Sequence, residues 1–386
     1  MNTKIFDITA LNEETIRKAQ VLCEAKAIAD VEAAMARVRE AAAILAGGGL
    51  VAFPTETVYG LGANALDEDA VRRVYAAKGR PADNPMIVHI ARASDIGRLT
   101  DGITPDAIRL ADRFWPGPLT MIFAKSAAVP AVVTGGLDTV AVRLPDCPAA
   151  EELIRLAGVP VAAPSANTSG RPSPTKAEHV IRDLDGKVDC ILAGGGCRVG
   201  IESTVVDLTS ETPTVLRPGI ISAYDLSIVL GKDVVYDAAL IDAARRDAAE
   251  AYEAGDDNAA VLPAGNADTV PAPRSPGMKY RHYAPTAEMI LIEGSPENIR
   301  REAERLKTMN EQLGRMVGVI LYGSENAGSG AANAEEAAAS YYARLRELDD
   351  SDADLIIAGA IPDTDGAGFA LMNRMRKSAA GKLIYV

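Results

Sequence analysis

The feature that most restricts the fold of this chain is a break in its pattern that begins near residue 234. Residues 234–266 consist largely of Ala, Asp and Glu, and residues 271–285 are rich in Pro together with basic and aromatic side chains. On both sides of the break, short apolar runs alternate with amphipathic helical patterns, which is typical of α/β domains. A chain of 386 residues also exceeds what one hydrophobic core usually spans. We therefore predict an α/β domain at 30–230, a connector at 231–286 and a second α/β domain at 287–386.

The net charge of the chain is concentrated in this connector. The stretch 233–268 holds nine acidic and two basic residues, which accounts for −7 of the total charge of −13. The negative charge is therefore a property of the connector and does not indicate a ligand site. Residues 1–29 are polar with weak helical character, and they suggest no role.

Composition excludes several classes of protein. No apolar run reaches the roughly 18 to 20 residues that a membrane-spanning helix needs, and the amino terminus lacks the apolar core of a secretion signal. The four cysteines form no Cys-x-x-Cys pair, and no two of the three histidines are three or four residues apart. Neither a disulfide framework nor a zinc site is indicated. We expect a cytoplasmic protein without membrane contact and without a protein-bound metal.

The first domain is predicted to carry a twisted, mixed sheet. The apolar run 50–53 ends at Pro54 and indicates a buried strand that delivers a Thr-Glu-Thr loop at its carboxyl end, where ligands of open α/β sheets often lie. Asp67 can cap a helix that runs through Lys78 and stops at Gly79. Further strands are predicted at 86–90, 119–124, 139–144, 160–163, 190–193, 204–208 and 214–216, and further helices at 30–45, 105–113, 149–157 and 176–184.

The second domain alternates strand and helix patterns as βαβαβ units do. Strands are predicted at 289–292, 317–322 and 355–357, and helices at 296–313 and 334–348. This order predicts a smaller, Rossmann-like α/β domain. It contains no G-x-G-x-x-G and no concentration of Asn, Arg, His or Ser, so we expect a regulatory or closing role rather than catalysis.

The strand at 139–144 contains a cation in an unusual place. A period of two puts Thr139 and Arg143 on one face and the apolar Val140 and Val142 on the other. An Arg within such a strand is costly to bury unless it meets an anion or a carboxylate. Arg143 facing a ligand cavity is therefore favoured over a structural salt bridge, and Arg217, at the end of another strand, is a weaker example of the same kind.

Several other segments could bind phosphate, although the first domain has no G-x-x-x-x-G-K-[ST] loop. Lys78 and Arg80 lie near Asn84 and His89, but cations also favour a helix carboxyl terminus for structural reasons alone, by about 0.3 to 1 kcal/mol. The hydroxyl-rich loop 163–173 and the pair Ser203-Thr204 fit either a phosphate site or ordinary turns.

The connector itself has two possible roles. Residues 275–285, which include His282, are unusually rich in basic and aromatic side chains for a connector. They could pack on the surface as a plain linker, or act as a lid that closes on a nucleotide.

These segments together resemble one family. The shared motifs, in chain order, are FPTETVYGLG at 53–62, KGRP at 78–81, NP at 84–85, His89, WPGPLT at 115–120, SAN at 165–167, ESTV at 202–205, RPG at 217–219 and SPGMKYRHYAP at 275–285. They resemble the YrdC-type L-threonylcarbamoyladenylate synthases in their long, two-domain form, over about residues 30–386. The resemblance implies a YrdC-like catalytic domain.

The resemblance also implies a reaction. Such an enzyme joins L-threonine, bicarbonate and ATP into threonylcarbamoyl-AMP and pyrophosphate, and partner proteins then transfer the threonylcarbamoyl group to position 37 of tRNA. An anionic carbamate that attacks an anionic α-phosphate needs cations and hydrogen-bond donors more than an acid-base pair. Mg²⁺ would arrive with the triphosphate.

The resemblance further implies residue roles. Threonine would be held by Thr57, His89, Arg143, Ser203 and the backbone of Ala163. ATP would be held by Arg80, Asn84, Thr139, Ser165, Ser173 and Arg217, with His282 completing the site from the connector. Lys78 and Arg80 would be the catalytic cations.

Two rival hypotheses stay open at this point. The chain could be an RNA-binding or ribosome-associated module without ATP turnover, since related single domains have a basic concave face, and weak RNA binding is expected in either case. It could also resemble the hydrogenase-maturation carbamoyl transfer proteins, which share the domain. Those proteins carry zinc-finger cysteine pairs that this sequence lacks.

Overall fold

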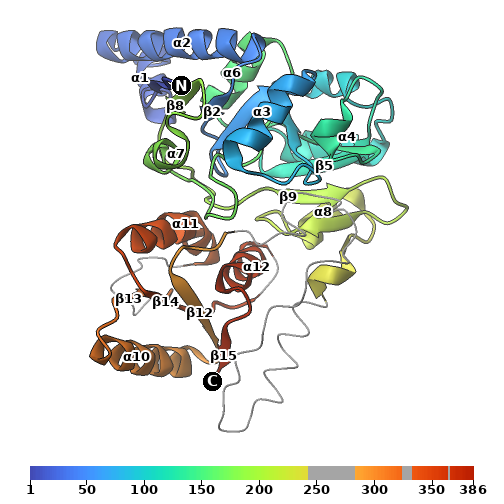
Figure 1. Ribbon diagram of the computed structural model, residues 1–386. Coiled ribbons are helices and arrows are strands. Elements are labelled where there is room, and N and C mark those ends of the chain that lie inside the picture. The colour runs from blue at the N-terminus through green and yellow to red at the C-terminus, as the bar shows by residue number, and fades with distance from the viewer. Residues whose placement is uncertain (242–282, 324–332, 364–365) are drawn as a thin grey trace.

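The computed structural model describes residues 1–241, 283–323, 333–363 and 366–386, and these form two β-sheets with their helices (Figure 1). The large sheet has 11 strands in the order β1-β8-β2-β3-β7-β4-β6-β5-β9-β10-β11, and the small one has four in the order β13-β14-β12-β15. Neighbours in the large sheet are both parallel and antiparallel, whereas those in the small sheet are all parallel. The predicted fold class, a mixed-sheet domain with a smaller α/β domain, is confirmed.

The strands of the large sheet are short and mostly buried. They are β1 (Lys4–Asp7), β2 (Val51–Phe53), β3 (Gly60–Asn64), β4 (Ile87–His89), β5 (Leu119–Ala124), β6 (Thr139–Arg143), β7 (Val161–Ala162), β8 (Cys190–Ala193), β9 (Thr204–Asp207), β10 (Thr214–Arg217) and β11 (Val235–Tyr236).

Helices cover this sheet. They are α1 (Glu13–Gln20), α2 (Ala25–Ala46), α3 (Glu68–Lys78), α4 (Pro105–Phe114), α5 (Ala131–Thr134), α6 (Pro148–Ala157), α7 (Ala177–Leu184) and α8 (Ala223–Leu230), with the 3₁₀ turn η1 (Ala93–Arg98). Asp67 caps α3 as predicted, because its side chain accepts hydrogen bonds from two N–H groups of the first turn. Over the part of the chain that the structure describes, no helix is both long and apolar enough to cross a membrane.

The amino-terminal segment belongs to the large sheet, which its sequence did not indicate. β1 pairs in parallel with β8 at the sheet edge, and α1 packs against α2. At the other end of the sheet, β11 pairs with β10. The sheet therefore begins before residue 30 and continues past residue 230.

The C-terminal domain has helices on both faces of its sheet. Its elements are β12 (Glu288–Glu293), α10 (Pro296–Gln312), β13 (Val317–Ile320), α11 (Ala334–Asp350), β14 (Leu355–Gly359), α12 (Ala367–Ala379) and β15 (Leu383–Tyr385). Ile299 and Leu306 of α10 pack on one face of the sheet. The helices α11 and α12 lie on the side that faces the large sheet (Figure 1).

The two domains share a buried apolar core. Val58 and Ile201 of the first domain cluster with Tyr342 of α11 and with residues of α12. At Gly200, with φ of +76°, an added Cβ would lie 2.4 Å from the Cα atom of Ala339. Only glycine allows so close an approach of a loop to the helix, so α11 is fixed directly against the loop that leads into β9.

Candidate active site

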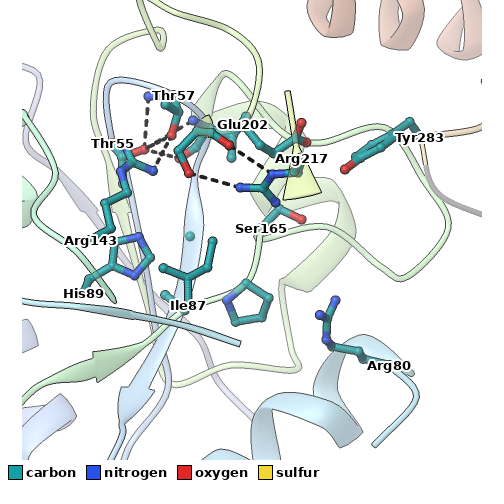
Figure 2. Close-up of a pocket in the computed structure, with 15 residues that line it drawn as sticks. Thr55, Thr57, Arg80, Ile87, His89, Arg143, Ser165, Glu202, Arg217 and Tyr283 are labelled. Atoms are coloured by element: carbon teal, nitrogen blue, oxygen red, sulfur yellow. Dashed lines mark hydrogen bonds between the residues drawn. The ribbon is translucent and has the colours of Figure 1, made fainter. Parts of the chain in front are cut away.

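A single pocket in the first domain collects most of the predicted residues (Figure 2). The atom-free space within it, including the part open to solvent, is about 610 Å³. It is lined by Thr55, Thr57, Val58, Gly60, Arg80, Ile87, His89, Arg143, Ala163, Pro164, Ser165, Glu202, Ser203, Arg217 and Tyr283. Figure 2 shows Thr55, Thr57, His89 and Arg143 gathered at one end, with Arg80 and Tyr283 at the other.

The register of the sheet brings the polar side chains of the first end together. His89 of β4 is the direct neighbour of Arg143 in the parallel pair with β6. Thr120 of β5 opposes Arg143 from the other side. Directly paired residues project to the same face of a sheet. The opposite face of β6 carries Val140 and Val142, which are buried in the main core, so Arg143 lines the pocket as the alternation predicts.

Arg217 reaches the pocket through an irregularity of β10. Val215 pairs with Val206 on the core face, and strict alternation would put Arg217 on that face too. The register instead shifts between these two positions, so that Arg217 opposes Val205, whose side chain lies on the pocket side of the sheet. A β-bulge turns consecutive side chains in this way, and it delivers the second buried guanidinium to the site.

Arg143 combines the two roles that the sequence left as alternatives. Its side chain is 4 % exposed and forms an ion pair with Glu56, at 2.6 Å between Nη2 and Oε2. The Nη1 group also donates to the Thr57 hydroxyl at 2.8 Å, and Nε donates to the Gly117 carbonyl at 3.2 Å. Arg143 thus lines the pocket, and its ion pair with Glu56 holds its side chain in place.

His89 is neutral in this environment. Burial, together with the nearby Arg143 cation, lowers the pKa of His89 to about 3. Its Nδ1 atom has no hydrogen-bond partner among the described residues. An unpaired ring nitrogen at the pocket wall can therefore accept or donate one hydrogen bond to a ligand, depending on its tautomer.

Ser203 holds the guanidinium of Arg217 in place. Ser203 Oγ lies 2.8 Å from the Thr120 hydroxyl and accepts a 3.0 Å hydrogen bond from Nη2 of Arg217. Nε of Arg217 donates to the Ser203 carbonyl, also at 3.0 Å. The position of the Arg217 guanidinium is therefore fixed on two sides before any ligand binds.

Lys78 lies under the pocket and does not line it. Its ζ-ammonium donates to the carbonyls of Ser165 and Asn167, at 2.5 Å for Ser165. Burial, more than the neighbouring cations, lowers the pKa of Lys78 well below its usual value. Lys78 thus contacts the backbone of the Ser165 loop, and its role as a catalytic cation stays a prediction.

The remaining residues predicted to bind nucleotide fall into two groups. Arg80 and Ser165 line the pocket, but Asn84, Thr139 and Ser173 do not. Asn84 is completely buried, and neither polar atom of its amide has a hydrogen-bond partner among the described residues. His282 lies outside the described residues.

The role of Glu202 in the pocket wall was not predicted from the sequence. It belongs to the ESTV motif, yet no role was predicted for it. Its Oε1 atom accepts from the Ser173 hydroxyl at 2.6 Å, and its Oε2 atom accepts from Nε of Arg374, on α12, at 3.0 Å. Tyr342 of α11 donates to Oε2 at 3.3 Å. The pocket wall therefore depends on side chains 140 and 172 positions away, which no local pattern indicates.

Tyr283, directly after the undescribed part of the connector, also lines the pocket. It has a φ of 70°, and its carbonyl accepts from the Ser378 hydroxyl of α12 at 2.9 Å. Its ring stacks against Tyr342, with 5.5 Å between centroids. The signal for it was the aromatic and basic connector motif, within which the sequence favoured its neighbour His282.

Comparisons with known proteins match both halves of the chain. Residues 43–219 match the Sua5/YciO/YrdC family, described as Telomere recombination, and residues 244–380 match the family described as Threonylcarbamoyl-AMP synthase, C-terminal domain. The threonylcarbamoyl-AMP synthase of Pyrococcus abyssi is 45 % identical over 91 % of this chain and 96 % of its own length. That of Bacillus subtilis is 45 % identical over 90 % of this chain and 94 % of its own.

Solved structures agree. A doubly substituted Sua5 of P. abyssi aligns with a TM-score of 0.81 and 42 % identity, over 100 % of this chain and 98 % of that one. The crystal structure of P. abyssi Sua5 complexed with L-threonine aligns with a TM-score of 0.79 and 46 % identity, over 91 % and 96 % of the two chains. This chain belongs to the two-domain threonylcarbamoyl-AMP synthase family.

Proposed function

We propose that the protein is an L-threonylcarbamoyladenylate synthase that uses L-threonine, bicarbonate and ATP. The threonine amine and bicarbonate combine to a carbamate with loss of water. A carbamate oxygen then bonds to the α-phosphorus of ATP while the bond to the β-phosphate oxygen breaks, which releases pyrophosphate. The threonylcarbamoyl-AMP product would pass to proteins that modify position 37 of tRNA.

The end of the pocket around Arg143 is the proposed threonine subsite. A guanidinium beside the Thr57 hydroxyl suits a carboxylate, because charge-assisted hydrogen bonds to planar anions are strong. The neutral ring of His89 adds a hydrogen-bonding group without a further charge. Ser203 and the backbone of Ala163 complete the lining of this end.

The end around Arg80 is the proposed nucleotide subsite. Arg80, Ser165 and Arg217 line it, and Tyr283 contributes an aromatic ring to its wall. Two guanidinium groups would stabilise the charge that develops between the α- and β-phosphates in the transition state. Lys78 would act by holding the Ser165 loop, while Asn84, Thr139, Ser173 and His282 stay predictions for this subsite.

Mg²⁺ is proposed to enter with the triphosphate. Among the described residues that line the pocket, Glu202 supplies the one carboxylate, and both of its oxygens already accept hydrogen bonds. Hard cations prefer several oxygen ligands. The ion would therefore take its ligands from phosphate oxygens and water.

The observation that carries this proposal is the pair of buried guanidinium groups, Arg143 and Arg217, that face one pocket next to a neutral His89. A pocket of this kind suits two anionic reactants better than a substrate that needs acid-base catalysis.

Pyrophosphate release from ATP tests the proposal. We expect release from the purified protein with Mg²⁺ only when L-threonine and bicarbonate are both present, and a product of the mass of threonylcarbamoyl-AMP. Release that ignores threonine would contradict it. ATP binding without any turnover, together with salt-dependent RNA affinity, would favour an RNA-binding module instead.

A further inference from the structure

The C-terminal domain places a charged side chain against the wall of the pocket. Arg374, on α12, is completely buried. Its Nε atom donates to Glu202 at 3.0 Å, and its Nη1 atom donates to the Pro218 carbonyl at 2.7 Å. Its guanidinium carbon lies 5.8 Å from the centre of the Tyr283 ring. One residue of the second domain thus contacts two residues that line the pocket, Glu202 and Tyr283, and the residue that follows Arg217.

The first contact governs the charge of the pocket wall. Burial alone would raise the pKa of Glu202, but the Arg374 and Arg217 cations outweigh it and hold that pKa below its usual value. Glu202 is therefore a carboxylate at neutral pH, and it lines a pocket that is proposed to receive a triphosphate. Without Arg374, the cations left near Glu202 would be Lys377 and Arg217, and Arg217 is also the cation that the phosphates require.

The second contact, from Arg374 to the Pro218 carbonyl, fixes the backbone next to Arg217. Pro218 follows Arg217 directly, just after the bulge that turns this side chain into the pocket. A hydrogen bond to the Pro218 carbonyl fixes the exit from β10, and so restrains the direction in which Arg217 points.

We propose that Arg374 is a positioning residue for ATP, which it serves by neutralising Glu202 and by fixing the peptide next to Arg217. This inference rests on the proposed function, and it assigns the C-terminal domain a part in nucleotide binding. Arg374 does not line the pocket, so it acts through these two groups. Threonine binding, at the Arg143 end, does not depend on it.

The chain offers a matched control on the same helix. Arg376, two positions further along α12, pairs with Glu293 through two hydrogen bonds of 2.9 and 3.1 Å. Glu293 ends β12 in the C-terminal sheet, remote from the pocket lining. Arg376→Gln therefore removes an arginine and its contacts with the Glu293 and Asp363 carboxylates from α12 without changing the charge next to Glu202.

The test measures binding of α,β-methylene-ATP with Mg²⁺ by calorimetry, at a temperature where circular dichroism shows each variant to be folded. Arg374→Gln should raise the Kd for the analogue at least tenfold and change the Kd for L-threonine less than threefold. Arg376→Gln should change neither by more than twofold. Adding Glu202→Gln to the Arg374→Gln variant should recover at least threefold of the lost affinity for the analogue, while the part that depends on the Pro218 contact stays lost.

Two results would overturn the inference. One is a change in nucleotide Kd below threefold for Arg374→Gln; the other is a larger loss that Glu202→Gln does not reduce at all. Because the analogue is bound and not turned over, a wild type that binds it but releases no pyrophosphate would refute the proposed reaction and leave this test intact.

Discussion

Replacing Arg143 by Gln removes two contacts of this side chain at once. One is the buried ion pair with Glu56 at 2.6 Å, and the other is the cationic edge that Arg143 presents to the pocket beside Thr57. If the pocket contact binds the threonine carboxylate, the substitution weakens binding. If Arg143 is only the partner of Glu56, the substitution weakens the fold alone.

The two effects have different sizes. A hydrogen bond to a charged group contributes about 1.5 to 3 kcal/mol, so loss of the guanidinium should weaken threonine binding roughly 10- to 150-fold. Removing one partner of a buried ion pair costs about 3 to 5 kcal/mol of stability, because the other charge stays buried and unpaired. Arg143→Gln should therefore lower both the threonine affinity and the free energy of unfolding.

A second substitution tells these effects apart. Adding Glu56→Gln to Arg143→Gln removes the unpaired charge, so urea denaturation should show most of the lost stability restored. Calorimetry with L-threonine should still show the weakened binding. A stable double variant that binds threonine as tightly as wild type would refute the assignment of Arg143 to the substrate carboxylate.

Three further predictions follow from the buried groups of the first domain. Lys78→Met should lower the free energy of unfolding by about 1 to 3 kcal/mol, measured in urea, because it leaves the Ser165 and Asn167 carbonyls without their donor; an unchanged midpoint would contradict the support role. The pKa of His89 is about 3 in the folded protein and about 6.5 in the unfolded chain. Between these pH values the unfolded chain binds more protons than the folded protein. The contribution of His89 to stability is therefore complete above about pH 6.5, and it falls on acidification by up to about 1.4 kcal/mol per pH unit. Urea titrations at pH 7 and pH 5.5 should therefore show a shallower pH dependence for His89→Gln than for wild type, and parallel slopes would contradict it. Gly200→Ala should lower the melting temperature in calorimetry, because the new Cβ would lie 2.4 Å from the Cα atom of Ala339 at a φ of +76°; an unchanged transition would show that the loop and α11 separate freely.

Local patterns were enough for much of the fold. The strands β5 and β8 have the predicted bounds, and α3 begins after the predicted cap at Asp67. Alternation along β6 was enough to put Arg143 opposite the apolar Val140 and Val142. These features depend on period and capping, which the sequence carries within a few residues.

Features that depend on distant partners were not predictable. β3 has the sequence Gly-Leu-Gly-Ala-Asn, with low strand propensity, and forms because β2 and β7 flank it. β1 has the sequence Lys-Ile-Phe-Asp and is mostly exposed, and it is a strand because it pairs with β8 at the sheet edge. In the site, the contact between Glu202 and Arg374 spans 172 positions. The motifs located the pocket, but they could not show that its wall is shared with the second domain.

The bulge in β10 has a consequence for how this chain tolerates changes in length. Because Arg217 faces the pocket only through a register shift after Val215, its direction is encoded by the number of residues before it as much as by its identity. Inserting one residue between Leu216 and Arg217 while the shift persists would turn the guanidinium toward the hydrophobic core, whereas deleting Leu216 would leave Arg217 directly after Val215 and still on the pocket face. Most conservative substitutions nearby would leave that count intact. Insertions between Val215 and Arg217 should therefore be far less tolerated than substitutions at the same positions.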